Sequence, residues 1–113
     1  HEEALSGRNL RALDEFYVDG AGLAVLEKAL AGETDPDVRV EMLYKLDQSG
    51  SYLALQQFVA SLHDPDPKVV VTAINILQEW DDEELLERYV QPLAEHDDED
   101  IRGAVREAFA SFD

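Results

Sequence analysis

The sequence predicts an all-α fold, and three features of the chain lead to this prediction. A helix start signal recurs at nearly equal intervals, apolar residues follow each signal with helical spacing, and a second helical pattern separates successive signals. The signals are Asp35-Pro36, Asp66-Pro67 and Asp98-Glu99. Aspartate suits the N-cap because its side chain accepts a hydrogen bond from the free N–H groups of the first turn. Proline suits the next position because its φ is already helical.

The residues after each signal repeat one face of a helix. Apolar side chains recur at three positions spaced four residues apart. Equivalent residues are separated by 31 positions (38 to 69) and then by 32 (69 to 101). We therefore expect helices over 36–47, 67–80 and 99–112. The aligned residues are Val38, Val69 and Ile101, then Met42, Ala73 and Val105, then Leu46, Leu77 and Phe109.

A second type of helix is expected between these three. "SYLALQQFVASL" and "EELLERYVQPLAEH" match each other, "GLAVLEKAL" is a weaker copy, and "LSGRNLRALDEFYV" fits a degenerate first helix. "KVVVTAINIL" is rich in β-branched residues, as strands are, but its helical spacing and its counterparts favour a helix. The apolar positions are Leu10, Leu13 and Phe16, then Leu23, Leu26 and Leu30, then Leu55, Phe58, Val59 and Leu62, then Leu86, Tyr89, Val90 and Leu93.

The residues between helices carry stop and start signals. Gly50 fits the end of one helix, with Ser49 or Ser51 as the cap of the next. Asp81 with Glu84 fits a capping box. Pro92 is expected to kink or break its helix, because it removes a backbone hydrogen bond.

The stretches "DPDVRVEMLYKL" and "DPDPKVVVTAINIL" resemble the start of the first helix in HEAT repeats, of the short type associated with phycobilisome lyases. The resemblance covers roughly residues 20–113. It implies a right-handed α-solenoid of about three helix pairs, the last one incomplete. We expect a single domain over 1–113, made of a degenerate first repeat (1–33), a second repeat (34–64), a third repeat (65–97) and a terminal helix (98–113).

The family pattern also implies a polar link between neighbouring repeats, from Arg39 to Asp64. The sequence departs from this pattern at three places, because Val70 stands where arginine is expected and Glu33 and His96 replace the aspartate. The alternative is that these residues are solvated loop charges, since exposed ion pairs contribute little to stability.

The resemblance implies a non-catalytic scaffold or protein–protein interaction module, and the alternative is a subunit or relative of a bilin-lyase-like enzyme. A partner is expected to bind along the second helices of the repeats, where Val25, Gln57 and Arg88 form one row and Lys28, Ala60 and Gln91 the next. The partner-binding residues that we predict are Lys28, Gln57, Arg88 and Gln91. The alternative for this strip is an ordinary solvated helix face.

Charge narrows the choice of partner. The chain has 113 residues, and its 9 basic and 26 acidic residues give a formal charge of −17. Such a charge repels phosphate backbones and so argues against nucleic-acid binding. It favours a protein partner with a basic surface, or else reflects a saline environment. No apolar run approaches the roughly 18 residues that span a bilayer.

Chemical sites are not expected. His63-Asp64 and His96-Asp97 resemble a repeated ligand pair, but the class of HEAT-repeat protein that binds iron, the deoxyhypusine hydroxylase type, uses His-Glu pairs. The acidic stretches "WDDEE" and "EHDDEDI" lack the glycine and distal glutamate of a calcium loop and coincide with helix starts. The chain has no cysteine and no nucleophile motif. We therefore predict no catalytic residue, no cofactor and no metal site.

Aromatic residues and the end of the sequence complete the predictions. Tyr44, Trp80 and Tyr89 are expected to pack in the core or between helices, not to form a ligand cage. No second helix follows the terminal helix in the sequence, so we expect that Phe109 and Phe112 self-associate, that they dock on another protein, or that the natural chain continues. The compartment stays open between the cytoplasm and, if a signal or anchor was removed before His1, an extracytoplasmic location.

Overall fold

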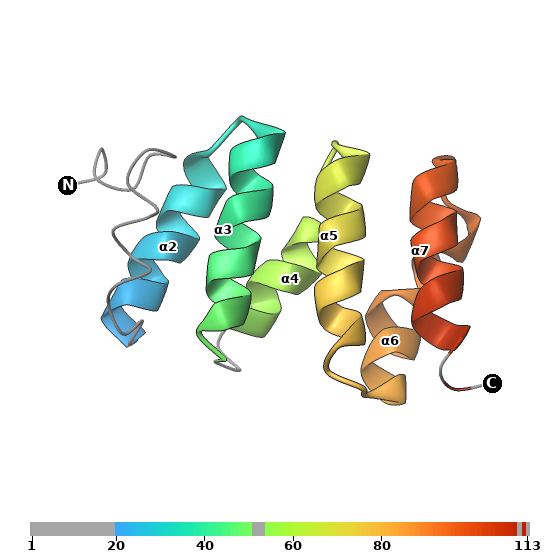
Figure 1. Cartoon of the computed structure of the whole chain (residues 1–113). Coiled ribbons are helices and arrows are strands. Elements are labelled where there is room, and N and C mark those ends of the chain that lie inside the picture. Colours follow the sequence, from blue (N-terminus) through green and yellow to red (C-terminus); the bar gives the residue numbers. More distant parts are fainter. Residues whose placement is uncertain (1–19, 51–53, 111, 113) are drawn as a thin grey trace. The chain divides into compact units, whose positions relative to one another are not determined.

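The computed structural model describes residues 20–50, 54–110 and 112, without the side chains of residues 20–23. These residues form six α-helices and one 3₁₀ helix, and no strand occurs among them (Figure 1). The all-α prediction is confirmed. The degenerate helix predicted from Leu10, Leu13 and Phe16 lies outside the described residues. The elements are α2 (Gly20–Gly32), α3 (Pro36–Gln48), α4 (Leu55–Ser61), α5 (Pro67–Gln78), α6 (Glu83–Tyr89), η4 (Gln91–Glu95) and α7 (Glu99–Ala110).

The chain divides into two compact units, His1–Gln57 and Phe58–Asp113, and the division falls within α4. In the first unit, α2 packs against α3 as an antiparallel hairpin (Figure 1). Apolar side chains at helical spacing supply the buried residues of both helices, as the sequence pattern predicts. Those residues are Leu26, Leu30, Met42, Leu43 and Leu46.

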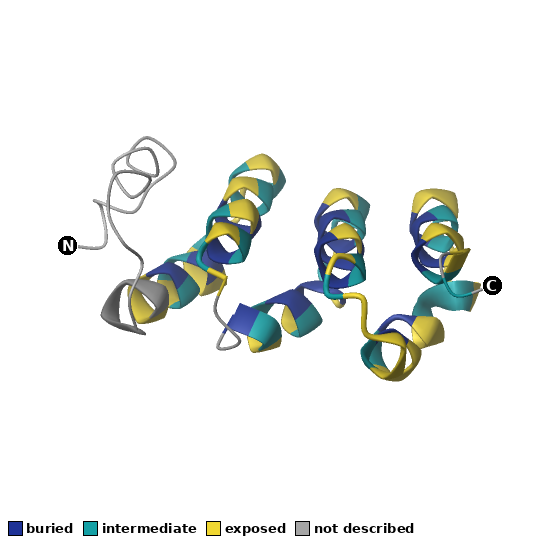
Figure 2. Cartoon of the chain, turned by 60° about the horizontal axis from the view of Figure 1, so that its bottom comes forward, coloured by how far each residue is buried: buried dark blue, intermediate teal, exposed yellow. Residues whose placement is uncertain are grey.

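In the second unit, the main packing is between α5 and α7, which run side by side in the same direction (Figure 1). The segment formed by α6 and η4 connects them and contacts both helices. α5 is apolar on most of its surface and is the most buried helix of this unit (Figure 2). Its buried residues are Val69, Val70, Thr72, Ala73, Ile74, Ile76 and Leu77, and those of α7 are Ile101, Ala104, Val105 and Ala108.

The three predicted helix starts are confirmed to the residue. The Asp35 carboxylate accepts from the Asp37 N–H at 2.9 Å, that of Asp66 accepts from the Lys68 N–H at 2.9 Å, and that of Asp98 accepts from the Ile101 N–H at 3.1 Å. Each bond satisfies a first-turn N–H that the helix itself leaves free. The predicted ends at 47, 80 and 112 lie one or two residues from the observed ends at 48, 78 and 110.

The break at Pro92 is also confirmed. α6 ends at Tyr89, and the chain continues as the 3₁₀ helix η4, in which Pro92 stands near the start. The Val90 N–H still donates to the Leu86 carbonyl at 2.8 Å, so the α-helical ladder ends just before the proline. A proline at position 92 has no N–H to continue that ladder.

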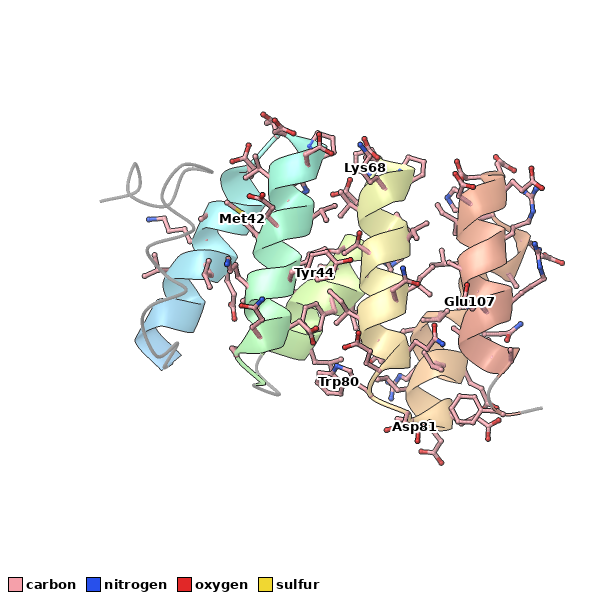
Figure 3. All side chains as sticks on the ribbon, in the orientation of Figure 1. Met42, Tyr44, Lys68, Trp80, Asp81 and Glu107 are labelled. Atoms are coloured by element: carbon pink, nitrogen blue, oxygen red, sulfur yellow. The ribbon has the colours of Figure 1, made fainter. Side chains whose placement is uncertain are left out.

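The predicted capping box at Asp81 is wrong by one residue. Asp82 is the N-cap of α6, and its carboxylate accepts from the Leu85 N–H at 3.1 Å. Asp81 instead has a left-handed φ of 52°, at the end of α5 (Figure 3). Gly50, the predicted stop 31 residues earlier, has a φ of 66°, so the two residues end equivalent helices in the same conformation. Aspartate is among the few non-glycine residues that tolerate this region.

Three further sequence predictions, for Ser49, Tyr44 and Phe109, need correction. Ser49 is the C-cap of α3, with its hydroxyl donating to the Leu46 carbonyl, and does not cap the next helix; Ser51 lies outside the described residues. Tyr44 is 45% exposed on α3, so it is not a core residue. Trp80 does pack as predicted, because its ring meets Phe58 edge to face with centroids 6.4 Å apart. Phe109 is half-buried, less than its place in the aligned apolar face predicts.

Candidate functional site

The four predicted partner-binding residues lie on the second helices of the repeats. Lys28 is exposed on α2 and Gln57 is half-buried on α4, both in the first unit. Arg88 is exposed on α6 and Gln91 is exposed at the start of η4, both in the second unit. Val25, in the same predicted rows, is 46% exposed. Three of the four predicted residues are therefore exposed.

Arg88 has a defined neighbour on the surface of α6. Its guanidinium carbon lies 5.5 Å from the centroid of the Tyr89 ring, within the range of a cation–π interaction. Arg88 also stands in the last turn of α6, where the helix dipole favours a positive charge. The ring contact favours one position of the guanidinium, and the dipole favours its positive charge. Arginine and tyrosine are residue types enriched at protein interfaces.

The surroundings of this arginine are strongly acidic. The second unit contains 15 acidic and 4 basic residues, a formal charge of −11, whereas the first contains 11 acidic and 5 basic, a charge of −6. Residues 81–84, which lead from α5 into α6, are all exposed acidic side chains and appear in yellow in Figure 2. Asp82 caps α6, and Glu83 and Glu84 occupy its first turn, where the dipole favours negative charge.

The turns before α3, α5 and α7 share a hydrogen bond that sequence reasoning missed. In each turn, the side chain two residues before the N-cap accepts from the backbone N–H of the N-cap. The acceptors are Glu33 (Oε2, 3.0 Å from Asp35 N), Asp64 (Oδ1, 2.9 Å from Asp66 N) and His96 (Nδ1, 3.0 Å from Asp98 N). Glu33 and His96 look like departures from the family pattern, but they keep this one function of the aspartate. Glu33 and His96 could have been found in the sequence as side chains with an acceptor atom two residues before a predicted N-cap.

The arginine four residues after the N-cap also has a local role. The Arg39 guanidinium donates to the carbonyls of Leu30 and Glu33, both at 2.9 Å. That of Arg102 donates to the carbonyls of His96 and Asp97, at 2.7 and 2.8 Å. Leu30 lies in the last turn of α2, and the other three carbonyls belong to the turns before α3 and α7. Each arginine therefore holds the turn that precedes its own helix. The proposed link from Arg39 to Asp64 joins different units and stays a prediction.

The histidines of the two His-Asp pairs differ in their surroundings. The His63 side chain is exposed, and its backbone N–H donates to the Ala60 carbonyl at 3.1 Å. His96 uses its ring nitrogen as the acceptor described above. Across the residues that the structure describes, no group of three or more histidine or acidic side chains is placed to hold a metal ion. Nor does the described part of the chain contain a helix long and apolar enough to cross a membrane.

Comparison with known protein families agrees with this architecture of capped, paired helices. The family model for HEAT repeats matches residues 23–110, which is most of the chain. The chain belongs to the HEAT-repeat family. Proteins built from HEAT repeats generally mediate protein–protein interactions or act as scaffolds, and they are typically non-catalytic. No significant match is found for this HEAT-repeat chain among curated proteins or among solved structures.

Proposed function

We propose that this HEAT-repeat chain is a non-catalytic interaction module that binds a protein with a basic surface. In this proposal Lys28, Gln57, Arg88 and Gln91 contact the partner, and the acidic residues around them attract it. The observation that carries the proposal is the contact of the exposed Arg88 with the half-buried ring of Tyr89, on a helix whose other charged residues are glutamates. A restrained arginine and aromatic ring supply specific contacts, while the surrounding carboxylates accelerate the encounter with a basic protein.

The experiment is affinity purification of partners from cell extract with the chain as bait, followed by titration of each purified partner. Arg88→Ala and Gln57→Ala test the strip, because they remove its contacts without adding a carboxylate that would itself attract a basic partner. Arg106→Ala is the matched control, because Arg106 is an exposed arginine on α7, outside the strip, and the charge change equals that of Arg88→Ala. We expect the two strip variants to weaken binding at least tenfold and the control to change it by less than about threefold.

Salt dependence tests the charge of the partner separately. Raising the salt from about 0.05 M to 0.5 M shortens the Debye length severalfold, so association with a basic partner should slow markedly. A partner whose affinity ignores both strip variants would show that the strip is an ordinary solvated helix face. If binding did not weaken with salt, the proposal that the partner has a basic surface would be wrong. The proposal that the strip residues contact the partner would still stand.

A further inference from the structure

The turn before α7 has a chemical property that the two equivalent turns lack. All three turns use a side chain to accept the backbone N–H of the N-cap, but the acceptor is a carboxylate in Glu33 and Asp64 and an imidazole nitrogen in His96. Ordinary carboxylates keep their negative charge down to about pH 4. An imidazole changes its charge between about pH 8 and pH 5. The third acceptor is therefore an imidazole, which loses its acceptor nitrogen when it binds a proton, whereas the other two are carboxylates.

The hydrogen bond from the Asp98 N–H requires one protonation state of the His96 ring. Because Nδ1 of His96 is the acceptor, its lone pair must be free and the ring must be neutral with its proton on Nε2. When a proton from solvent binds Nδ1, this nitrogen becomes a donor, and two N–H groups then point at each other across 3.0 Å. The bond is lost, and the ring must turn away from Asp98 N.

We propose that His96 makes the start of α7 sensitive to pH, because on protonation the ring releases the Asp98 N–H and turns toward a neighbouring carboxylate. The starts of α3 and α5 have carboxylate acceptors and do not share this response. Arg102 continues to hold the carbonyls of His96 and Asp97, so the change is confined to the His96 ring and the N-terminal turn of α7.

The charges around His96 determine where the protonated ring goes. Carboxylates dominate both neighbouring elements and the turn itself, whereas Arg102 repels an imidazolium, which favours rotation of the ring toward the carboxylates. The charged groups are Glu95 in η4, Asp97 and Asp98 in the turn, Glu99, Asp100, Arg102, Arg106 and Glu107 in α7, Glu83, Glu84, Glu87 and Arg88 in α6, and Lys68 in α5.

Two-dimensional NMR of backbone amides, recorded from about pH 7.5 to pH 5, tests the proposal on the full chain. The Asp98 amide resonance should move with the same midpoint as the His96 ring signals. Its protection from hydrogen exchange, corrected for the intrinsic pH dependence, should fall about twofold to tenfold. The amides of Asp35 and Asp66 should show neither change.

His96→Asp provides the decisive variant, because it installs the acceptor that Asp64 already provides in the preceding turn. This variant should fold and should abolish both pH effects at Asp98. His63→Gln is the matched control and should leave them unchanged, since the His63 ring lies outside this hydrogen bond. An Asp98 amide that ignores titration of the His96 ring, or that still responds in the His96→Asp variant, would overturn the proposal.

Discussion

The turn before α5 and the turn before α7 begin their helices alike but are closed by different chemistry. Both have an aspartate N-cap and an acceptor side chain two residues earlier. Four residues after the cap, however, α7 has Arg102, whose guanidinium binds two turn carbonyls, whereas α5 has Val70, which is 1% exposed. One turn is held by polar bonds to its backbone and the other by apolar burial of the residue at the same position.

The two turns therefore share the backbone geometry of a capped helix start, but different interactions hold that geometry in each. A buried valine contributes through the apolar area that it removes from water. A half-buried arginine contributes through two hydrogen bonds from a charged donor, which are individually stronger than neutral ones. Each residue suits its helix, because α5 is buried over most of its surface and α7 on one side.

The largest expected effect comes from placing the arginine of one turn in the other. Val70→Arg should lower the free energy of unfolding by about 2–4 kcal/mol, because a guanidinium would replace a buried side chain in a packed site. Urea denaturation followed by Trp80 fluorescence measures it, since Trp80 is the single tryptophan and lies in the same unit. Val71→Arg, at a half-buried neighbour, should cost less than about 1 kcal/mol. If Val70→Arg were as stable as the wild type, an arginine could hold the turn before α5 as Arg102 holds the turn before α7.

The second effect comes from removing the arginine of the polar turn. Arg102→Ala should lower the free energy of unfolding by about 1–2 kcal/mol, because two carbonyls lose a charged donor at a half-exposed site. The same urea titration measures it. Arg106→Ala, at an exposed position of the same helix, is the control and should change stability by about 0.5 kcal/mol or less. An Arg102→Ala variant as stable as this control would mean that the two bonds contribute nothing to the turn.

The N-caps Asp66 and Asp98 should contribute equally to stability, because the two turns differ at Val70 and Arg102 and not at their caps. Asp66→Ala and Asp98→Ala should each cost about 1 kcal/mol, the usual effect of losing an N-cap acceptor. Asn at either position keeps an acceptor and should recover most of the loss. Thermal unfolding of the four variants, monitored by circular dichroism, compares them directly. A loss at one cap more than twice that at the other would show that the closing residue also controls the cap.

The smallest effect concerns the left-handed residues that end α3 and α5. Asp81→Gly should raise the free energy of unfolding by roughly 0.5 kcal/mol, because glycine adopts a φ of 52° without strain. Gly50→Ala should lower it by about 1 kcal/mol, although no atom lies within 4 Å of the added Cβ, because the cost is conformational. Differential scanning calorimetry resolves shifts of this size. Destabilisation by Asp81→Gly would indicate that the Asp81 side chain has a role beyond its backbone conformation.

The sequence predicted best those features that depend on adjacent residues. The caps at Asp35, Asp66 and Asp98, the stop at Gly50 and the break at Pro92 each follow from local backbone chemistry, and all were confirmed. Two adjacent aspartates, by contrast, present equivalent caps, so the sequence alone does not decide between Asp81 and Asp82. The choice depends on where α5 ends, and the packing of the helix sets that point.

The candidate site was less predictable because its features depend on contacts between segments. Tyr44 was expected to pack because it is aromatic, although the apolar face of α3 runs through Met42 and Leu46, and its side chain proves to be 45% exposed. The acceptors Glu33 and His96 were hidden because side chains of different chemistry perform one function. Lys28, Gln57, Arg88 and Gln91 remain predictions, since a binding surface leaves no local signature in sequence.

The shortness of α6 has a consequence for how the second unit unfolds. A helix of 7 residues is too short to be stable alone in water, and Pro92 prevents α6 from growing longer. Its helical state must therefore come from burial of residues such as Leu86 and Val90 and from the contacts that η4 makes with α7. Deleting the residues from Glu99 onward should melt α6 and η4 as well, and protease digestion would then cut throughout residues 83–95. Cooperativity in this unit thus arises from an element that cannot fold by itself.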